Sequence, residues 1–252
     1  MKLTILGQGA SCPNPGGACS GYLVEEDDTH ILLDCGSGVV SQLRRVFDYR
    51  RVSAIIISHM HADHFLDLIP YTYGLRIGSG LWNGFRPLLL LPPNGQAVLD
   101  HVTSPWPDLA PSMASVFRIG EYEVNEPLQI GSLRVEFTPT RHYIPANAIN
   151  VLGGSKLSYS SDTGPADQLT AHAQDADLFL CEASLRERHN LPGEEGHLTA
   201  RDAGEIASKA SVRKLVLTHF FVEFGLHEML QNASAAFPGP IELAETRAEY
   251  VI

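Results

Sequence analysis

The 252-residue sequence contains no apolar segment near the ~20 residues that a membrane-spanning helix needs. It also lacks low-complexity tracts, charge runs and linkers rich in proline, serine and glycine. Four cysteines (Cys12, Cys19, Cys35 and Cys181) are too few and too irregularly spaced for a disulfide framework, and none forms a CxxC zinc pair. We therefore expect one domain over residues 1–252 that does not associate with a membrane and does not depend on disulfides.

Positive charge is scarce as well, because 18 lysines and arginines face 29 aspartates and glutamates, which gives a formal net charge of −11 at pH 7. Surfaces that bind nucleic acid are usually basic, so this balance disfavours broad electrostatic attraction to nucleic acid. The first residues, Met1–Gly7, lack the basic, apolar and cleavable layout of a signal peptide. This absence predicts a cytoplasmic location. Apolar residues make up 44% of the chain, enough for a large core.

The most informative stretch runs from Ile55 to His64 and reads Ile-Ile-Ile-Ser-His-Met-His-Ala-Asp-His. Its β-branched residues predict a buried strand that delivers four potential metal ligands. Because alternate side chains point in opposite directions at a strand end, the four cannot all face one ion. We expect His59 and His61 to share one ion, and Asp63 and His64 to face a second. The alternative is a solvated, histidine-rich turn.

Later segments repeat this arrangement, in which a predicted strand leads to a polar group that can bind metal or transfer a proton. The strands are predicted over Leu133–Phe137, Lys156–Ser161, Asp177–Cys181 and Lys214–Thr218, and they lead to His142, Asp162, Glu182 and His219. A carboxylate has two oxygens, so Asp162 can reach both ions. The alternatives are an N-terminal cap for Asp162, before a helix that begins near Pro165, and ordinary core histidines for His142 and His219.

Elsewhere the pattern predicts further regular elements. The predicted helices are Val39–Phe47, Phe65–Ile77 with Pro70 inside it, and Ala200–Ala210 with Thr199 as its N-cap. Between Pro105 and Pro127 the pattern is irregular, with possible strands over Val116–Ile119 and Glu121–Val124. The Gly-rich loop Gly7–Gly21 either brings its backbone close to a ligand or only permits turns.

The HxHxDH sequence from His59 to His64 resembles the signature of the metallo-β-lactamase superfamily, and the resemblance extends over nearly the whole chain. It implies an α/β fold, a four-layer αβ/βα sandwich of two mixed β-sheets flanked by helices, and a possible homodimer. The assembled ligand set would be His59, His61 and His142 at the first ion, Asp63, His64 and His219 at the second, and Asp162 between them. Asp34 resembles an aspartate that braces the histidine loop, the alternative being a cap for the helix that starts at Val39.

These nitrogen and oxygen ligands, without a thiolate, suit two divalent metal ions, most simply Zn²⁺, and also Mn²⁺ or Fe. Two ions separated by ~3.5–4 Å can hold a bridging hydroxide and stabilise both the entering and the leaving oxygen of an in-line displacement. This arrangement favours phosphoester hydrolysis, with Asp63 placed to orient the attacking water. Because metal ions dominate the local field, the acidic balance of the chain does not exclude a small anionic substrate.

The leaving alkoxide needs a proton, and a histidine that is held and charged by a carboxylate is a competent general acid near neutral pH. Glu182 in Cys-Glu-Ala-Ser and His197 in Gly-His-Leu-Thr-Ala resemble the glutamate and the HxT loop of the ribonuclease Z-like branch of the superfamily. The resemblance therefore implies that Glu182 and His197 form the catalytic acid pair. The alternative is that His197 is an ordinary histidine of a surface loop.

Ribonuclease Z carries a long arm that grips transfer RNA between its third histidine and its bridging aspartate, whereas only nineteen residues separate His142 from Asp162 here. We therefore expect a hydrolase that cleaves the phosphodiester bond of a small substrate, such as a cyclic nucleotide or a short oligonucleotide. The alternatives are maturation of transfer RNA 3′ ends, which is less favoured, and a glyoxalase II-like thioesterase. A β-lactamase, a flavin-partnered di-iron reductase and a non-catalytic binding module are weaker interpretations.

Overall fold

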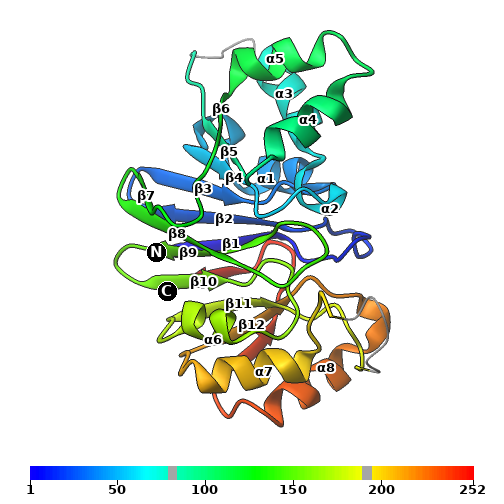
Figure 1. The fold of residues 1–252 in the computed structure, drawn as a ribbon, viewed down its shortest axis with the longest axis vertical. Coiled ribbons are helices and arrows are strands. Elements are labelled where there is room, and N and C mark those ends of the chain that lie inside the picture. The colour runs from blue at the N-terminus through cyan, green and yellow to red at the C-terminus, as the bar shows by residue number, and fades with distance from the viewer. Residues whose placement is uncertain (79–83, 189–194) are drawn as a thin grey trace.

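The computed structural model describes residues 1–78, 84–188 and 195–252, whose strands form two seven-stranded sheets (Figure 1). In spatial order, the first sheet contains β14 (Glu249–Val251), β1 (Lys2–Gly7), β2 (Gly21–Glu26), β3 (Thr29–Leu33), β4 (Ala54–Ile56), β5 (Leu88–Leu91) and β6 (Arg118–Glu121). The second contains β13 (Ile241–Leu243), β12 (Leu215–Thr218), β11 (Leu178–Glu182), β10 (Lys156–Tyr159), β9 (Asn147–Leu152), β8 (Leu133–Pro139) and β7 (Leu128–Ile130). Both sheets mix parallel and antiparallel pairs.

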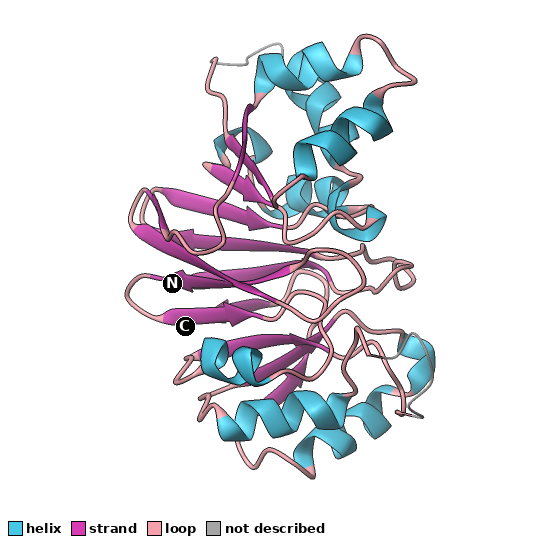
Figure 2. Ribbon diagram, viewed as in Figure 1, coloured by secondary structure: helices cyan, strands magenta, loops and turns pink. Residues whose placement is uncertain are grey.

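Helices cover the outer faces of the two sheets, so the molecule has four layers (Figure 2). The outer face of the first sheet is covered by α1 (Val39–Val46), α3 (Leu68–Tyr73), α4 (Gly95–Thr103) and α5 (Leu109–Val116). The short α2 (Ala62–Phe65) lies near the sheet edge. The second is covered by α6 (Asp167–Ala173), α7 (Ala200–Lys209) and α8 (Leu226–Ser234). The predicted αβ/βα sandwich is therefore confirmed. None of the helices in the described ranges has both the length and the apolarity required to cross a membrane.

The apolar strand before the histidine-rich loop shows why the sheets are buried on both faces. Ala54 and Ile56 pack into the core between the two sheets, while Ile55 and Ile57 pack against the helices of the first sheet. All four side chains are fully buried. Burial of a large aliphatic side chain stabilises a fold by roughly 1.5–3 kcal/mol, so this strand is a rigid support for the loop that follows it.

The strand directions bring the loops of both sheets to one edge. Strands β3, β4, β5 and β6 are parallel to one another in the first sheet. In the second, β10, β11 and β12 are parallel, and β8 shares their direction because both β8 and β10 pair antiparallel with β9. The carboxyl ends of parallel strands lie at the same edge of a sheet, which is where α/β proteins place their ligands.

Several predicted elements differ from the structure. The helix predicted over Phe65–Ile77 is instead α2, α3 and a π-helix over Gly74–Gly78, and Pro70 lies in the first turn of α3, where no N–H is needed. The predicted strand Val116–Ile119 is wrong at its start, because α5 extends to Val116 and β6 begins only at Arg118. The strand predicted over Glu121–Val124 is also wrong, since β6 ends at Glu121.

Candidate metal centre

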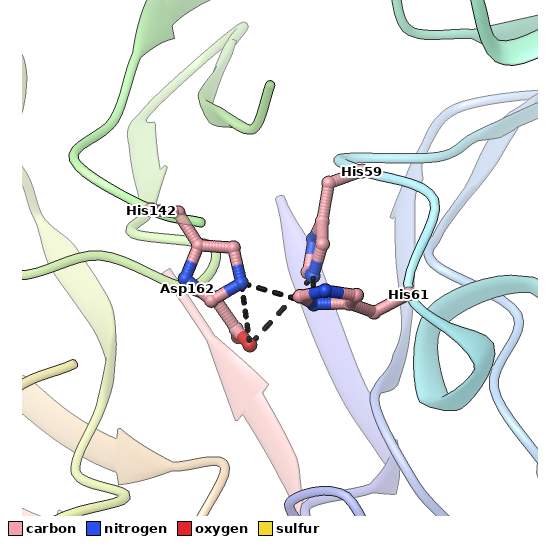
Figure 3. Close-up of side chains that lie close together, drawn as sticks. All are labelled: His59, His61, His142 and Asp162. Atoms are coloured by element: carbon pink, nitrogen blue, oxygen red, sulfur yellow. Dashed lines mark hydrogen bonds and ion pairs between the residues drawn. The ribbon is translucent and has the colours of Figure 1, made fainter. Parts of the chain in front are cut away.

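Four side chains from three loops converge at the sheet edge to form a first group of potential ligands: His59, His61, His142 and Asp162 (Figure 3). Nδ1 of His61 lies 3.1 Å from Nε2 of His59 and 3.0 Å from Nε2 of His142. Oδ2 of Asp162 lies 3.7 Å from Nε2 of His59 and 3.9 Å from Nε2 of His142. The four ligand atoms are thus close enough to surround one ion.

A second group consists of Asp63, His64, His219 and the same Asp162. Nε2 of His64 lies 3.4 Å from Nε2 of His219, which is also 3.2 Å from Oδ2 of Asp63. Oδ1 of Asp162 lies 3.4 Å from Nε2 of both histidines. Asp162 therefore directs one oxygen into each group, as the two-ion interpretation of the sequence predicts.

The ring nitrogens that point away from the centre are held by fixed acceptors. Nδ1 of His142 lies 2.9 Å from the carbonyl oxygen of Gly196, and Nδ1 of His64 lies 2.8 Å from Oδ2 of Asp34. A carbonyl oxygen and a carboxylate oxygen can only accept, so each Nδ1 carries the proton and each Nε2 presents a lone pair. In the neutral rings, the Nε2 lone pair of His142 therefore lies 3.0 Å from Nδ1 of His61, and that of His64 lies 3.4 Å from Nε2 of His219, where a cation can bind both nitrogens of each pair.

The buried charge of the site also favours a bound cation. Oδ1 of Asp162 is buried and has no hydrogen-bond partner among the described residues. Burial would raise the pKa of Asp162, but the neighbouring charges of His219 and His64 hold this pKa well below its usual range. Burial lowers the pKa of His59 well below its ordinary value, with His64 adding to the effect. A buried, ionised carboxylate among several imidazoles is a donor set for divalent cations, so the residues present fit two metal ions.

Asp34 braces the histidine loop, as predicted. Its carboxylate accepts hydrogen bonds from the backbone N–H of Ser58 (2.7 Å), the Ser58 hydroxyl (2.9 Å), Nδ1 of His64 (2.8 Å) and the Tyr159 hydroxyl (2.8 Å). It does not cap α1, whose N-cap is Gly38. The backbone at Asp34 is left-handed, with φ = 58°.

Two further site segments share this unusual backbone conformation. Ser161, immediately before Asp162, has φ = 53°, and His219 itself has φ = 50°. Non-glycine residues in the left-handed region cost of order 1–3 kcal/mol and concentrate at functional sites. Three of the eight non-glycine residues with positive φ in the described ranges therefore lie in segments of the site.

Glu182 and His197 form a pair beside the second group. Nδ1 of His197 donates to Oε1 of the fully buried Glu182 at 2.9 Å, and the His197 ring lies 6.0 Å from the His219 ring in a stacked arrangement. Backbone N–H groups of Thr163, Ser184 and Leu198 also donate to the Glu182 carboxylate. Burial would lower the pKa of His197, but the charge and hydrogen bond of Glu182 outweigh this and raise the pKa to about 9. His197 is thus not an ordinary surface-loop histidine.

The Gly-rich loop Gly7–Gly21 supports the strand end that carries His219. Asn14 donates to the carbonyl oxygen of Phe220 (3.0 Å) and accepts from the backbone N–H of Val222 (3.2 Å). Among the described residues, none of the groups able to hold a metal includes a cysteine of this loop. The loop therefore acts on the site through the backbone that follows His219.

Two residues that contribute to the site were not assigned a role from the sequence. Ser184 links Glu182 to His219 through its hydroxyl, and Tyr143 lies beside His142 and His197. Ser184 stands two positions after Glu182 in the Cys-Glu-Ala-Ser segment, and Tyr143 directly follows His142. Adjacency to a predicted site residue was the available signal, and it does not reveal which way a side chain points.

Comparison with known proteins decides the family. The model of a beta-lactamase superfamily domain matches residues 29–220. The chain belongs to the metallo-β-lactamase superfamily. This superfamily member is 32% identical to an uncharacterized protein of Mycobacterium leprae over 251 residues, covering 96% of this chain and 85% of the relative.

Two further relatives carry more informative names. The "Probable metallo-hydrolase YhfI" of Bacillus subtilis is 28% identical over 252 residues, which is 98% of each chain. The crystal structure of YhfI superposes with a TM-score of 0.86 at 24% identity, covering 99% of both chains. A ribonuclease Z of Ignicoccus hospitalis is 25% identical over 293 residues of alignment, covering 94% of each chain. The superfamily and the His/Asp groups together support a metal-dependent hydrolase.

Proposed function

We propose that this metallo-β-lactamase superfamily member hydrolyses phosphodiester bonds of small substrates, namely cyclic nucleotides or short oligonucleotides. The observation that carries the proposal is the His197–Glu182 pair, joined at 2.9 Å beside the second ligand group. A phosphodiester leaves as an alkoxide, which must be protonated, and the pair supplies a protonated imidazole for that purpose.

The proposed ligands are the seven predicted residues: His59, His61, His142, Asp63, His64, His219 and the bridging Asp162. Zn²⁺, Mn²⁺ or Fe fits this set of nitrogen and oxygen donors, and Zn²⁺ is the first choice. Two such ions, when bound, would lower the pKa of a water molecule and neutralise the charge of the phosphate. The protein then has to orient the water and deliver a proton.

Asp63 is proposed to orient the attacking water. Burial would raise the pKa of Asp63, but the adjacent side chains of His219 and His64 hold this pKa well below its usual range. The carboxylate is therefore ionised at neutral pH and can accept a hydrogen bond from water. Its side chain keeps 12% of its surface exposed, so water can reach it.

His197 is proposed to protonate the leaving oxygen. Its Nδ1–H is committed to Glu182, so the other ring nitrogen, Nε2, is the position from which a proton can be transferred. With a pKa raised to about 9, the ring is charged at neutral pH. A thiolate leaving group needs no such acid, and the pair therefore favours a phosphodiesterase over a glyoxalase II-like thioesterase.

The segment between His142 and Asp162 favours a small substrate. Residues 143–161 are all described, and they form β9 and β10 with a tight turn in which the Gly153 N–H donates to the Ser155 carbonyl oxygen at 3.0 Å. The alignment with ribonuclease Z is 293 residues long against 252 residues in this chain, so the ribonuclease has segments that this chain lacks. Transfer RNA 3′ processing is therefore the second candidate.

The test compares substrates on protein loaded with Zn²⁺ or Mn²⁺. We expect hydrolysis of 2′,3′- or 3′,5′-cyclic nucleotides and of bis-p-nitrophenyl phosphate, with at least a hundredfold loss in His197→Ala, since positioned acid catalysis contributes ~10²–10⁴-fold. His101→Ala, which removes an exposed histidine of α4, is the matched control. Site-specific cleavage of precursor transfer RNA would establish the second candidate instead. Turnover of a thioester alone would overturn the proposal.

A further inference from the structure

Tyr143 stands at the rim of the candidate centre and takes no part in holding metal or moving protons. It directly follows His142, and 46% of its surface is exposed. Its ring centroid lies 4.8 Å from that of His142 and 5.6 Å from that of His197. The tyrosine ring therefore touches one potential ligand and the proposed general acid at the same time.

One face of this ring is packed against Gly196. An ideal Cβ placed on Gly196 would lie 2.5 Å from Cζ of Tyr143 and 2.8 Å from each of its two Cε atoms. Because Cζ is the nearest atom and the Cε atoms are equally distant, this position lies over the ring face and not beyond the hydroxyl. Gly196 thus packs against one face of the ring, while nearly half of the residue's surface is exposed at the rim of the centre.

The position of Gly196 is itself fixed. Its carbonyl oxygen accepts the hydrogen bond from Nδ1 of His142 at 2.9 Å, which ties the His197 loop to the loop that carries Tyr143. Only glycine allows this approach, since any side chain would collide with the tyrosine ring. The backbone therefore holds the aromatic ring as a rigid surface beside the site.

From this geometry we infer that Tyr143 is a stacking surface for the nucleobase of the substrate, which makes it a specificity-determining residue. The tyrosine ring lies one imidazole ring away from the ligand atom of His142, a spacing comparable to the one sugar ring between a base and its phosphate. Stacking also needs no positive charge, which agrees with a chain of net charge −11. The inference deepens the proposed function and rests on it, because it names a nucleoside phosphodiester as the substrate class.

The experiment measures binding and turnover separately. By calorimetry on metal-loaded protein, wild type should bind adenosine 5′-monophosphate about tenfold more tightly than ribose 5-phosphate, since stacking of one base has this order of effect. Tyr143→Leu should abolish the preference by weakening only the nucleotide, and Tyr143→Phe should retain it. Tyr73→Leu, which changes a tyrosine of α3 with 39% exposure, is the matched control and should behave as wild type.

Turnover adds the second readout with 2′,3′-cyclic AMP and glycerol 1,2-cyclic phosphate. Both contain the reacting five-membered cyclic phosphate, and the second lacks the ribose and the base. Tyr143→Leu should reduce kcat/KM about tenfold for the first and leave the second unchanged. Equal affinity of wild type for the two monophosphates, or equal losses for both members of a pair in Tyr143→Leu, would overturn the inference. If wild type hydrolyses neither cyclic phosphate, the proposed function fails, while the binding comparison still decides whether Tyr143 stacks on a base.

Discussion

The hydroxyl of Ser184 lies 2.8 Å from Nδ1 of His219 and 2.5 Å from Oε2 of Glu182. A carboxylate can only accept, so the hydroxyl donates to Glu182 and accepts the N–H of His219. This arrangement fixes the His219 tautomer, whose Nε2 lone pair points toward Asp63 and Asp162. A single hydroxyl therefore connects the proposed proton donor to the second ligand group.

The first prediction concerns this hydroxyl. Ser184→Ala leaves Nδ1 of His219 without an acceptor and frees the ring to turn, so we expect metal affinity at the second group and kcat each to fall roughly 10–100-fold. Ser184→Thr keeps a hydroxyl and should recover most of the loss. Metal content after dialysis against buffers of fixed free Zn²⁺ measures the effect. Unchanged zinc retention in Ser184→Ala would show that the hydroxyl does not orient His219.

The second prediction concerns the pH dependence of the acid. The pKa of His197 is about 9, and a general acid works only below its pKa, so wild-type kcat should decline as the pH rises through about 9. In Glu182→Gln the pKa of His197 should fall toward the ordinary value near 6.5 or below it. The alkaline decline should then begin near neutral pH, with at least a roughly tenfold loss of kcat at pH 8. Glu205→Gln, a change at an exposed position on α7, should reproduce the wild-type pH profile. Identical pH profiles for Glu182→Gln and Glu205→Gln would exclude the His197–Glu182 pair as the general acid.

The third prediction separates bracing from backbone strain at Asp34. Asp34→Ala leaves four buried donors without their acceptor and places alanine at φ = 58°, so we expect a loss of at least about 3 kcal/mol in the free energy of unfolding. Asp175→Ala is the matched control, because this exposed aspartate has φ = 55°. Its loss should be about 1 kcal/mol, the strain alone. Urea unfolding of both variants provides the comparison, and equal losses would show that the hydrogen bonds of Asp34 contribute nothing.

Local patterns were sufficient for most of the candidate site. The strand before His59 is apolar at successive positions because both of its faces are buried, and such a run is visible in sequence. Asp162, Glu182 and His219 follow similar runs, so the shared direction of their strands brings them to one edge. Thr199 also caps α7 as predicted, with Asp202 completing a capping box.

Elements held by distant partners could not be recognised in this way. In β9, Asn147 and Asn150 interrupt the apolar pattern, and their amides donate to the Tyr122 hydroxyl and the His172 carbonyl oxygen. Those acceptors come from other parts of the chain, so no local pattern shows that the polar residues are satisfied. The short β14 has a similar origin, because it exists only through its pairing with β1 at the opposite end of the sequence.

The fourth prediction concerns removal of metal. Without a cation, Nδ1 of His61 and Nε2 of His142 lie 3.0 Å apart with no metal to bind them both, and Oδ1 of Asp162 stays buried without a hydrogen-bond partner among the described residues. Binding of metal to the folded state alone stabilises it by about 4 kcal/mol when free metal is at a thousand times its dissociation constant. We expect a chelator to lower Tm by several degrees and Zn²⁺ to restore it. In Asp162→Asn the response to Zn²⁺ should largely disappear, and a Tm that ignores metal in wild type would contradict the proposed centre.

The last prediction concerns acid stability away from the centre. His172 on α6 is buried, Nδ1 lies 2.8 Å from the Thr138 hydroxyl, and Nε2 has no hydrogen-bond partner among the described residues. Burial lowers the pKa of His172 to about 3. The unfolded chain, with a histidine pKa near 6.5, therefore binds more protons between pH 3 and 6.5, and stability must fall as the pH drops through this range.

From pH 7 to pH 4 this difference amounts to on the order of 3 kcal/mol, at 1.36 kcal/mol for each pH unit below 6.5. His172→Gln carries no titrating group, so its free energy of unfolding should fall less steeply by about that amount. Other buried histidines titrate equally in both proteins, which makes the difference between the two pH profiles the informative quantity. His101→Gln, at an exposed position, should follow the wild-type profile. Parallel profiles for His172→Gln and wild type would mean that the His172 ring accepts a proton in the folded protein without cost.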